Sequence, residues 1–186
     1  MRAMSERRFP DLWVDPENDP RESDRQPEGE RETLLNYLRN QRLTFQLKCD
    51  GLDAQQLAQR SVPPSSLSLL GLMRHLADVE HSWFRQTIGG SDQPRHYRTA
   101  EDRYADFNGA VADLECVAEA RAIWQSATND ADAIIAGVDD LGATFPLRDG
   151  ERIALREVLV HMVEEYARHN GHADLLRERI DERTGQ

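Results

Sequence analysis

The chain has 186 residues, of which 34 are acidic and 23 basic, so its formal net charge is −11 at pH 7. Nucleic acids and anionic membrane surfaces bind basic protein faces, so this charge argues against both as partners. A hydrophobic content of 39% and a charged content of 31% are typical of a soluble globular protein. An acidic chain can still bind a small anionic molecule through a few well-placed arginines.

Segments that would direct the chain out of the cytoplasm are not evident. The first ten residues are charged and lack the apolar centre of a secretory signal, and no apolar run approaches the roughly 20 residues of a membrane span. Cys49 and Cys116 fit neither a CxxC nor a zinc-finger spacing. We therefore expect a cytoplasmic protein with two reduced thiols. Lys48 is the only lysine among 23 basic residues, which indicates a GC-rich genome.

Residues 1–28 differ in composition from the rest of the chain. They carry four prolines and many charges, which predicts an extended N-terminal arm rather than a packed element. The exception is the apolar cluster at residues 9–14, which we expect to dock onto the remainder of the chain. Residues 29–186 are expected to form a single domain.

Helical periodicity dominates that domain. Four long amphipathic segments are expected at about 29–48, 67–88, 114–138 and 155–181, with a short helix at 53–59. An Asp-Gly step at 149–150 is a hairpin signal, so the connector at 141–153 could form a small two-stranded excursion. Long amphipathic helices without convincing strands predict an all-α four-helix bundle. The polar stretch at 89–113 is long for a loop and could join two helices that run parallel.

Two polar residues on the last helix fall on the side that faces the core. Glu165 and His169 are one helical turn apart, and His169 lies near the centre of the apolar stripe. A carboxylate at the edge of a core is costly unless it is paired or binds a metal. His75 lies at the margin of the apolar stripe of the second long helix. Together, His75, Glu165 and His169 form a candidate three-ligand metal site.

Other polar residues have simpler interpretations. Glu80 falls near the centre of an apolar stripe, and a structural bond to an arginine or to a backbone end is the favoured partner for it. His81 is expected to face solvent, and His96 in the polar crossover is either a substrate contact or without a role. The arginines nearest to the site in sequence are expected to be solvated; they are Arg74, Arg156 and Arg168.

The stretches Leu72-Met73-Arg74-His75-Leu76-Ala77-Asp78-Val79-Glu80 and 160–174 resemble the DinB-like superfamily. This superfamily includes mycothiol-dependent maleylpyruvate isomerases and bacterial thiol S-transferases, and the chain is most similar to its actinobacterial mini-circle branch. His75 matches the ligand that precedes a Leu-Ala-x-x-Glu run. His169, followed by Asn170-Gly171, matches the last ligand. Glu165 stands where many members have histidine. The mycothiol-dependent isomerase branch shows the same Glu-x-x-x-His form, so this difference narrows the match, and it leaves the identity of the metal open.

The resemblance covers nearly all of residues 29–182 and implies a fold and an activity. The fold would be an up-down-down-up bundle with a long crossover between helices 2 and 3, often found as a homodimer. The activity would be a metal-dependent transfer of a thiol, most plausibly mycothiol, to an electrophilic small molecule. Zinc is the expected metal, and nickel, iron or manganese are the alternatives.

Two other functions fit the same residues. Two histidines and a carboxylate also describe non-haem Fe(II) oxygenases, and metal-assisted hydrolysis is a weaker enzymatic alternative. The bundle could instead hold a metal or small ligand without catalysis, in a closed site. His161 and His172 are then the candidates for a fourth protein ligand.

Overall fold

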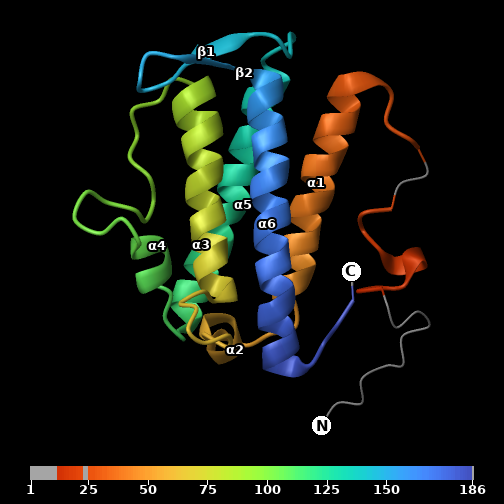
Figure 1. The fold of residues 1–186 in the computed structure, drawn as a ribbon, viewed down its shortest axis with the longest axis vertical. Helices are drawn as coiled ribbons and strands as arrows, with labels where there is room; N and C mark the ends of the chain where they lie inside the picture. The colour runs from red at the N-terminus through yellow and green to blue at the C-terminus, as the bar shows by residue number, and fades with distance from the viewer. Residues whose placement is uncertain (1–11, 23–24, 186) are drawn as a thin grey trace.

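Four long helices lie side by side in the computed structural model, which describes residues 12–22 and 25–185 (Figure 1). They are α1 (Gly29–Cys49), α3 (Leu69–Glu80) with its continuation η2 (His81–Ile88), α5 (Leu114–Ala136) and α6 (Leu155–Asp181). Every boundary lies within two residues of the position expected from the hydrophobic pattern. The expectation of a mostly helical chain is therefore confirmed.

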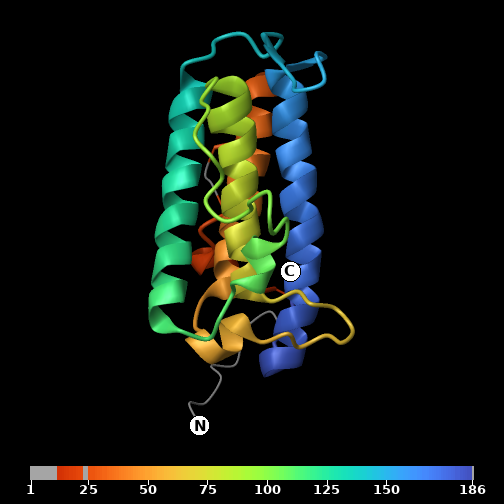
Figure 2. The same ribbon diagram turned by 90° about the vertical axis from the view of Figure 1, so that its left-hand side faces the viewer.

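The helices form two pairs. α1 packs against α6, and α3 packs against α5. In Figure 1, α1 and α6 run from top to bottom, whereas α3 and α5 run from bottom to top. Because α3 and α5 are parallel, the chain between them has to return along the length of the bundle. Figure 2 shows this crossover, residues 89–113, descending over the outside of α3.

The core lies between the four helices and is almost entirely apolar. Its fully buried side chains include Leu38, Phe45, Leu72, Met73, Leu76, Phe84, Ala120, Ala131, Val158, Leu159, Met162 and Ala173. Glu80 is a charged residue within this core and has no exposed surface. Both of its oxygens accept hydrogen bonds of 2.7 Å from the Arg42 guanidinium, and Tyr166 donates a third at 2.8 Å. The expected arginine partner of Glu80 is thus present, and it comes from α1.

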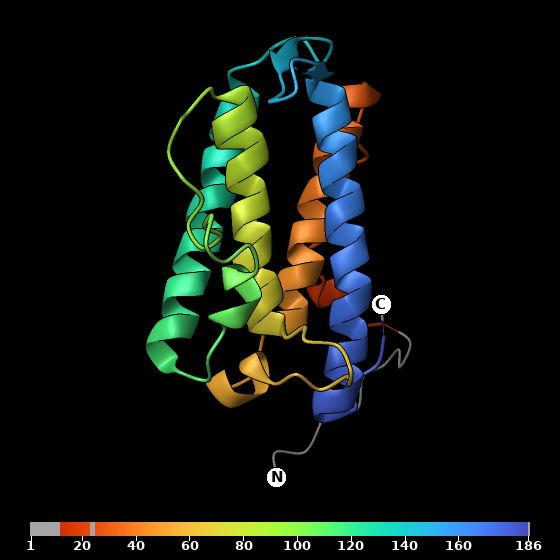
Figure 3. The same cartoon turned by 60° about the vertical axis from the view of Figure 1, so that its left-hand side comes forward.

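Short elements close the ends of the bundle. α2 (Ala54–Ala58) follows α1, and α4 (Ala105–Asn108) lies within the crossover beside the lower part of α3 (Figure 3). β1 (Thr144–Pro146) pairs antiparallel with β2 (Arg152–Ala154), which confirms the hairpin signal at Asp149–Gly150. Gly150 adopts a φ of +89°, a conformation that favours glycine. Within the described residues, none of the helices has the length and apolarity that a membrane crossing requires.

Part of the N-terminal arm packs against the bundle. Trp13 is only 1% exposed, and its indole donates a hydrogen bond to the Leu47 carbonyl oxygen. The Lys48 ammonium lies 3.7 Å from the centre of the Trp13 ring, and the Arg183 guanidinium lies 4.1 Å from it. The arm also contains one short helix, η1 (Pro16–Asn18). Residues 9–11 of the apolar cluster lie outside the described residues.

The upper half of the second long helix is a π-helix. Its last turn is closed by a hydrogen bond from the Gly89 amide to the Phe84 carbonyl, which spans five residues instead of four. A Cβ at Gly89 would lie 2.8 Å from the Arg85 carbonyl oxygen, which is too close. Glycine, which has no Cβ, therefore fits at the end of this wide turn. Single π-helical turns inside helices are frequent at functional sites.

Candidate metal centre

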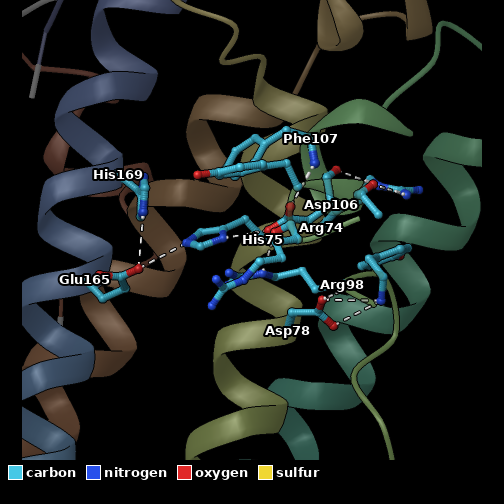
Figure 4. A network of polar contacts seen from close by, with 12 residues as sticks. Arg74, His75, Asp78, Arg98, Asp106, Phe107, Glu165 and His169 are labelled. Atoms are coloured by element: carbon cyan, nitrogen blue, oxygen red, sulfur yellow. Dashed lines mark hydrogen bonds and ion pairs between the residues drawn. The ribbon is translucent and has the colours of Figure 1, made fainter. Parts of the chain in front are cut away.

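His75 lies in the middle of α3, between one and two turns after its N-terminus. Ser68 caps this helix by accepting a hydrogen bond from the Gly71 amide, which fixes where the helix begins. His75 is half-buried, with its ring facing α6 and the short helix α4 (Figure 4). Its position at the margin of the apolar stripe therefore places it between two other elements.

Glu165 and His169 lie four residues apart on α6 and point toward His75 (Figure 4). Glu165 Oε1 is 3.1 Å from His75 Nε2 and 3.3 Å from His169 Nε2. The rings of His75 and His169 meet edge to face, with 4.8 Å between their centres. One carboxylate oxygen therefore lies between two imidazole nitrogens that come from opposite helix pairs.

This donor set suits a divalent metal. One ligand atom from each of His75, Glu165 and His169 lies within 4.8 Å of the others, and all three residues are partly shielded from solvent. Two histidines with one carboxylate are a common set for zinc and for other first-row metals. In the described residues no fourth histidine, cysteine or carboxylate joins this group.

Asp106 orients His75 from the crossover. Its carboxylate Oδ2 lies 2.9 Å from His75 Nδ1, and it is only 1% exposed. Because a carboxylate can only accept, Nδ1 carries the proton and Nε2 points to the centre. Phe107 stacks on the same imidazole, with 5.1 Å between ring centres. Carboxylates in this position orient metal-binding histidines and raise their basicity.

Arg74 fixes the position of α4 and thereby supports the contact between Asp106 and His75. Its guanidinium donates to the carbonyl oxygens of Asp106 at 2.9 Å and Ala105 at 3.1 Å. It also stacks on the Tyr97 ring, 3.9 Å from the centre. A Cβ at Gly109 would lie 2.6 Å from the Arg74 guanidinium, so this glycine leaves the space that Arg74 occupies. Arg74 is buried, and the expectation that it is solvated is wrong.

His169 has a partner on its other nitrogen. Its Nδ1 lies 3.2 Å from Nδ1 of His172, one turn further along α6, and its Nε2 faces Glu165. One of the two Nδ1 atoms donates and the other accepts. His172 is thus placed to orient His169 rather than to join the group of three.

The hydrogen bonds change the acidity of the group. Those from His169 and His75 lower the pKa of Glu165 far below its ordinary value, in spite of burial. Burial by itself would lower the pKa of His75, but the hydrogen bonds with Asp106 and Glu165 outweigh it and raise the pKa. Glu165 is therefore an ionised carboxylate at neutral pH, the form that binds metals.

The centre opens into a cavity of about 610 Å³. The cavity lies between η2, the crossover, the β-hairpin loop and the first half of α6. His75 and Glu165 line this cavity. His161, one turn earlier on α6, lines it as well, and its ring is tilted against that of Trp83 with 4.8 Å between ring centres. Pockets for small ligands commonly have volumes of roughly 300–1,000 Å³. The cavity can therefore hold a ligand of moderate size beside the three candidate ligands.

Two further histidines, His81 and His96, lie outside the group of three candidate ligands. His81 is buried, with Nε2 3.2 Å from the Gln93 carbonyl oxygen, so the expectation that it faces solvent is wrong. The crossover folds over this face of the helix and covers it. His96 is exposed and packs edge to face against His81, 4.8 Å between ring centres.

The crossover is fixed to α3 by Asp78. Its carboxylate accepts hydrogen bonds from the backbone amides of His96, Tyr97 and Arg98, at 2.7 to 3.3 Å (Figure 4). Asp106, which sequence reasoning missed, lies in the same crossover. The only sequence signal for it is an acidic residue between the aromatic residues Tyr104 and Phe107 in an otherwise polar segment.

Comparison with known proteins gives one match. The family model described as Mycothiol-S-transferase matches residues 33–182, which include all three candidate ligands, Asp106 and His172. Searches of curated proteins and of solved structures return no match for the chain. The family match spans most of the chain and agrees with the resemblance carried by α3 and α6. The chain therefore belongs to the mycothiol S-transferase family, a family of enzymes in the DinB-like group of thiol transferases.

Proposed function

We propose that the protein is a divalent-metal-dependent mycothiol S-transferase that acts on electrophilic small molecules. His75, Glu165 and His169 are the proposed ligands, with zinc as the expected metal. The observation that carries the proposal is the convergence of these three side chains from α3 and α6, two of which, His75 and Glu165, line a cavity. The family match supports mycothiol as the thiol, and the set of two histidines and one carboxylate supports a divalent metal.

The proposed fold assignment is the DinB-like, up-down-down-up bundle formed by residues 29–186, preceded by an arm at residues 1–28. The opposite directions of the two helix pairs and the crossover between α3 and α5 support it (Figures 1 and 2). This arrangement matters for the chemistry. It brings the middle of α3 next to the middle of α6, where Glu165 and His169 lie, and places the crossover beside the site.

A divalent cation at this site would lower the pKa of a coordinated thiol, so that the thiolate is available near neutral pH. The residues of the chain provide the rest. Asp106 and His172 orient the two imidazoles, and Glu165 contributes the negative charge of the ligand set. The cavity leaves room for the electrophile beside the thiol. In a substitution, a carbon–sulfur bond forms while the leaving group departs with its electron pair, and the thiol proton passes to solvent.

The test is metal content measured beside activity. We expect wild-type protein to bind roughly one equivalent of metal by elemental analysis and to accelerate conjugation of mycothiol with 1-chloro-2,4-dinitrobenzene. His169→Ala and Glu165→Gln should lose both properties. Glu164→Gln is the matched control, because Glu164 is the exposed neighbour of Glu165 on the same helix. Full metal occupancy in His169→Ala would overturn the ligand assignment.

The iron oxygenase alternative makes a different prediction from the same donor set. Protein loaded with Fe(II) under anaerobic conditions would then take up oxygen with an organic substrate and without mycothiol. The family match favours thiol transfer, for which oxygen uptake is not expected. Oxygen consumption coupled to substrate oxidation, with no thiol conjugate formed by any metal-loaded form, would overturn the proposed reaction.

A further inference from the structure

Three arginines line the cavity beside the proposed metal centre. Arg95 and Arg98 come from the crossover, and Arg148 comes from the loop between β1 and β2. All three share the cavity with His75 and Glu165. Figure 4 shows the Arg98 side chain beside His75. Positive side chains from two separate segments therefore gather at one end of the pocket.

None of the three arginines forms an ion pair within the part of the chain that the structure describes. Arg95 donates to the Ser82 hydroxyl at 2.7 Å, and the Arg98 Nε donates to the Arg103 carbonyl oxygen at 2.8 Å. Both partners are neutral. Besides Glu165, which faces His75 and His169, two carboxylates line the same cavity, Asp92 and Asp149; both are exposed, and neither lies within ion-pair distance of an arginine.

The three arginines gather in a chain that is acidic as a whole, with 34 acidic residues against 23 basic ones. Burial lowers the pKa of Arg95, and the neighbouring charges of Arg98 and Arg148 lower it further, whereas the carboxylates of Asp78 and Asp106 offset part of this effect. Like charges held together repel each other, and an anion placed among them would relieve this repulsion.

The thiol does not account for the arginines. The cysteine carboxyl group of mycothiol is part of an amide bond, so the molecule carries no carboxylate, phosphate or sulfonate. Its sugar and inositol hydroxyl groups are neutral. The charge complementarity of the cavity therefore concerns the other substrate. Arginine is also the side chain whose planar fork matches a carboxylate best.

We propose that the electrophilic substrate carries a carboxylate, which Arg95, Arg98 and Arg148 bind while its electrophilic carbon faces the metal centre. This inference rests on the proposed thiol transfer and names the substrate class for the same site. Arg98 is the main contact, since its guanidinium lies beside His75 (Figure 4). The crossover thereby contributes both Asp106, which orients a ligand, and the arginines that select the substrate.

The test compares two electrophiles that differ in one charge. 4-Chloro-3-nitrobenzoate and 4-chloro-3-nitrobenzamide both lose chloride when mycothiol attacks the ring carbon, and each rate is divided by its uncatalysed rate. We expect wild-type enzyme to favour the benzoate by tenfold or more. Arg98→Gln should lower kcat/KM for the benzoate by about ten- to hundredfold, the worth of a charged hydrogen bond, and lower it for the benzamide by a much smaller factor. Arg103→Gln is the control, since only the backbone of Arg103 contacts Arg98.

A binding measurement separates this inference from the proposed reaction. 3-Nitrobenzoate has no leaving group, and its affinity is measured by calorimetry with metal-free and metal-loaded protein, beside 3-nitrobenzamide. Binding of the benzoate that Arg98→Gln weakens tenfold or more supports the anion site even if no thiol transfer is detected. Equal preference for benzoate and benzamide, or an equal loss of both in Arg98→Gln, overturns the carboxylate assignment and leaves the proposed reaction standing.

Discussion

Asp106 accepts a hydrogen bond from Nδ1 of His75 across 2.9 Å, although the two residues lie on different elements and 31 positions apart in sequence. This contact ties the crossover to the candidate metal centre. It gives the crossover a chemical role besides that of connecting two parallel helices, because the orientation of His75 depends on it.

Replacing Asp106 should weaken metal binding without unfolding the protein. Asp106→Asn keeps the size of the side chain but removes the charge that supports His75. We expect a loss of roughly 10- to 100-fold in metal affinity, typical of such partners, measured by competition with a chromogenic chelator. Glu101→Gln, an exposed change in the same crossover, should bind metal like wild type. An unchanged affinity in Asp106→Asn would show that His75 does not need this partner.

The buried pair of Arg42 and Glu80 should be the most sensitive point of the core. Arg42→Met leaves the Glu80 carboxylate without its main partner in a site with no exposed surface. The expected cost is about 3–5 kcal/mol in the free energy of unfolding, measured with urea. Arg39→Met, an exposed change on the same helix, should cost far less.

A second variant tests the cause of that cost. Adding Glu80→Gln to Arg42→Met removes the unpaired charge, so the double variant should recover part of the lost stability. A double variant as unstable as the sum of both single variants would show that the pair is not coupled in this way.

Trp13 should anchor the N-terminal arm to the bundle. Its ring is buried among the charged groups of Lys48, Arg177 and Arg183. Trp13→Ala removes this contact area and the favourable position of the cations over the ring, and we expect a loss of about 3–5 kcal/mol in unfolding free energy. Trp13→Phe should lose less. A change below about 1 kcal/mol for Trp13→Ala would mean that the arm adds little to the stability of the bundle.

The two cysteines should differ sharply in reactivity. Burial raises the pKa of the Cys49 thiol to about 12, so almost none of it is ionised at pH 8. Cys116 is partly exposed near the start of α5. A titration of the native protein with a thiol reagent at pH 8 should detect one thiol, and a second should appear in urea. Cys116→Ser protein should not react until it is unfolded; rapid reaction of its native form would contradict the burial of Cys49.

The helices follow from local pattern, whereas the surroundings of the site do not. The period of apolar residues defines α6 at both ends, and the Asp-Gly step locates the hairpin. Helical phase also brings Glu165 and His169 to one face. The assignment of His75 as the third ligand depended on the family resemblance, because helical phase placed His75 only at the edge of the apolar stripe of its helix.

What sequence could not provide was the path of the crossover. The crossover covers His81, fixes its own backbone on Asp78 and brings Asp106 to His75. These are contacts between residues far apart in sequence, and no local periodicity encodes them. Glu80 shows the intermediate case: its burial was predictable from helical phase, but the choice of Arg42 required knowing that α1 lies against this face.

The order of the elements has a consequence for synthesis of the chain on the ribosome. α1 pairs with α6, the first long helix with the last, whereas α3 and α5 are nearer neighbours in sequence. The pair of α3 and α5 can form while α6 is still being made, but α1 has to wait for its partner until α6 has emerged. The proposed ligands are divided in the same way, with His75 early and Glu165 and His169 late. Metal capture by this centre would therefore mark a completed bundle, and a truncated product that lacks α6 would be released without it.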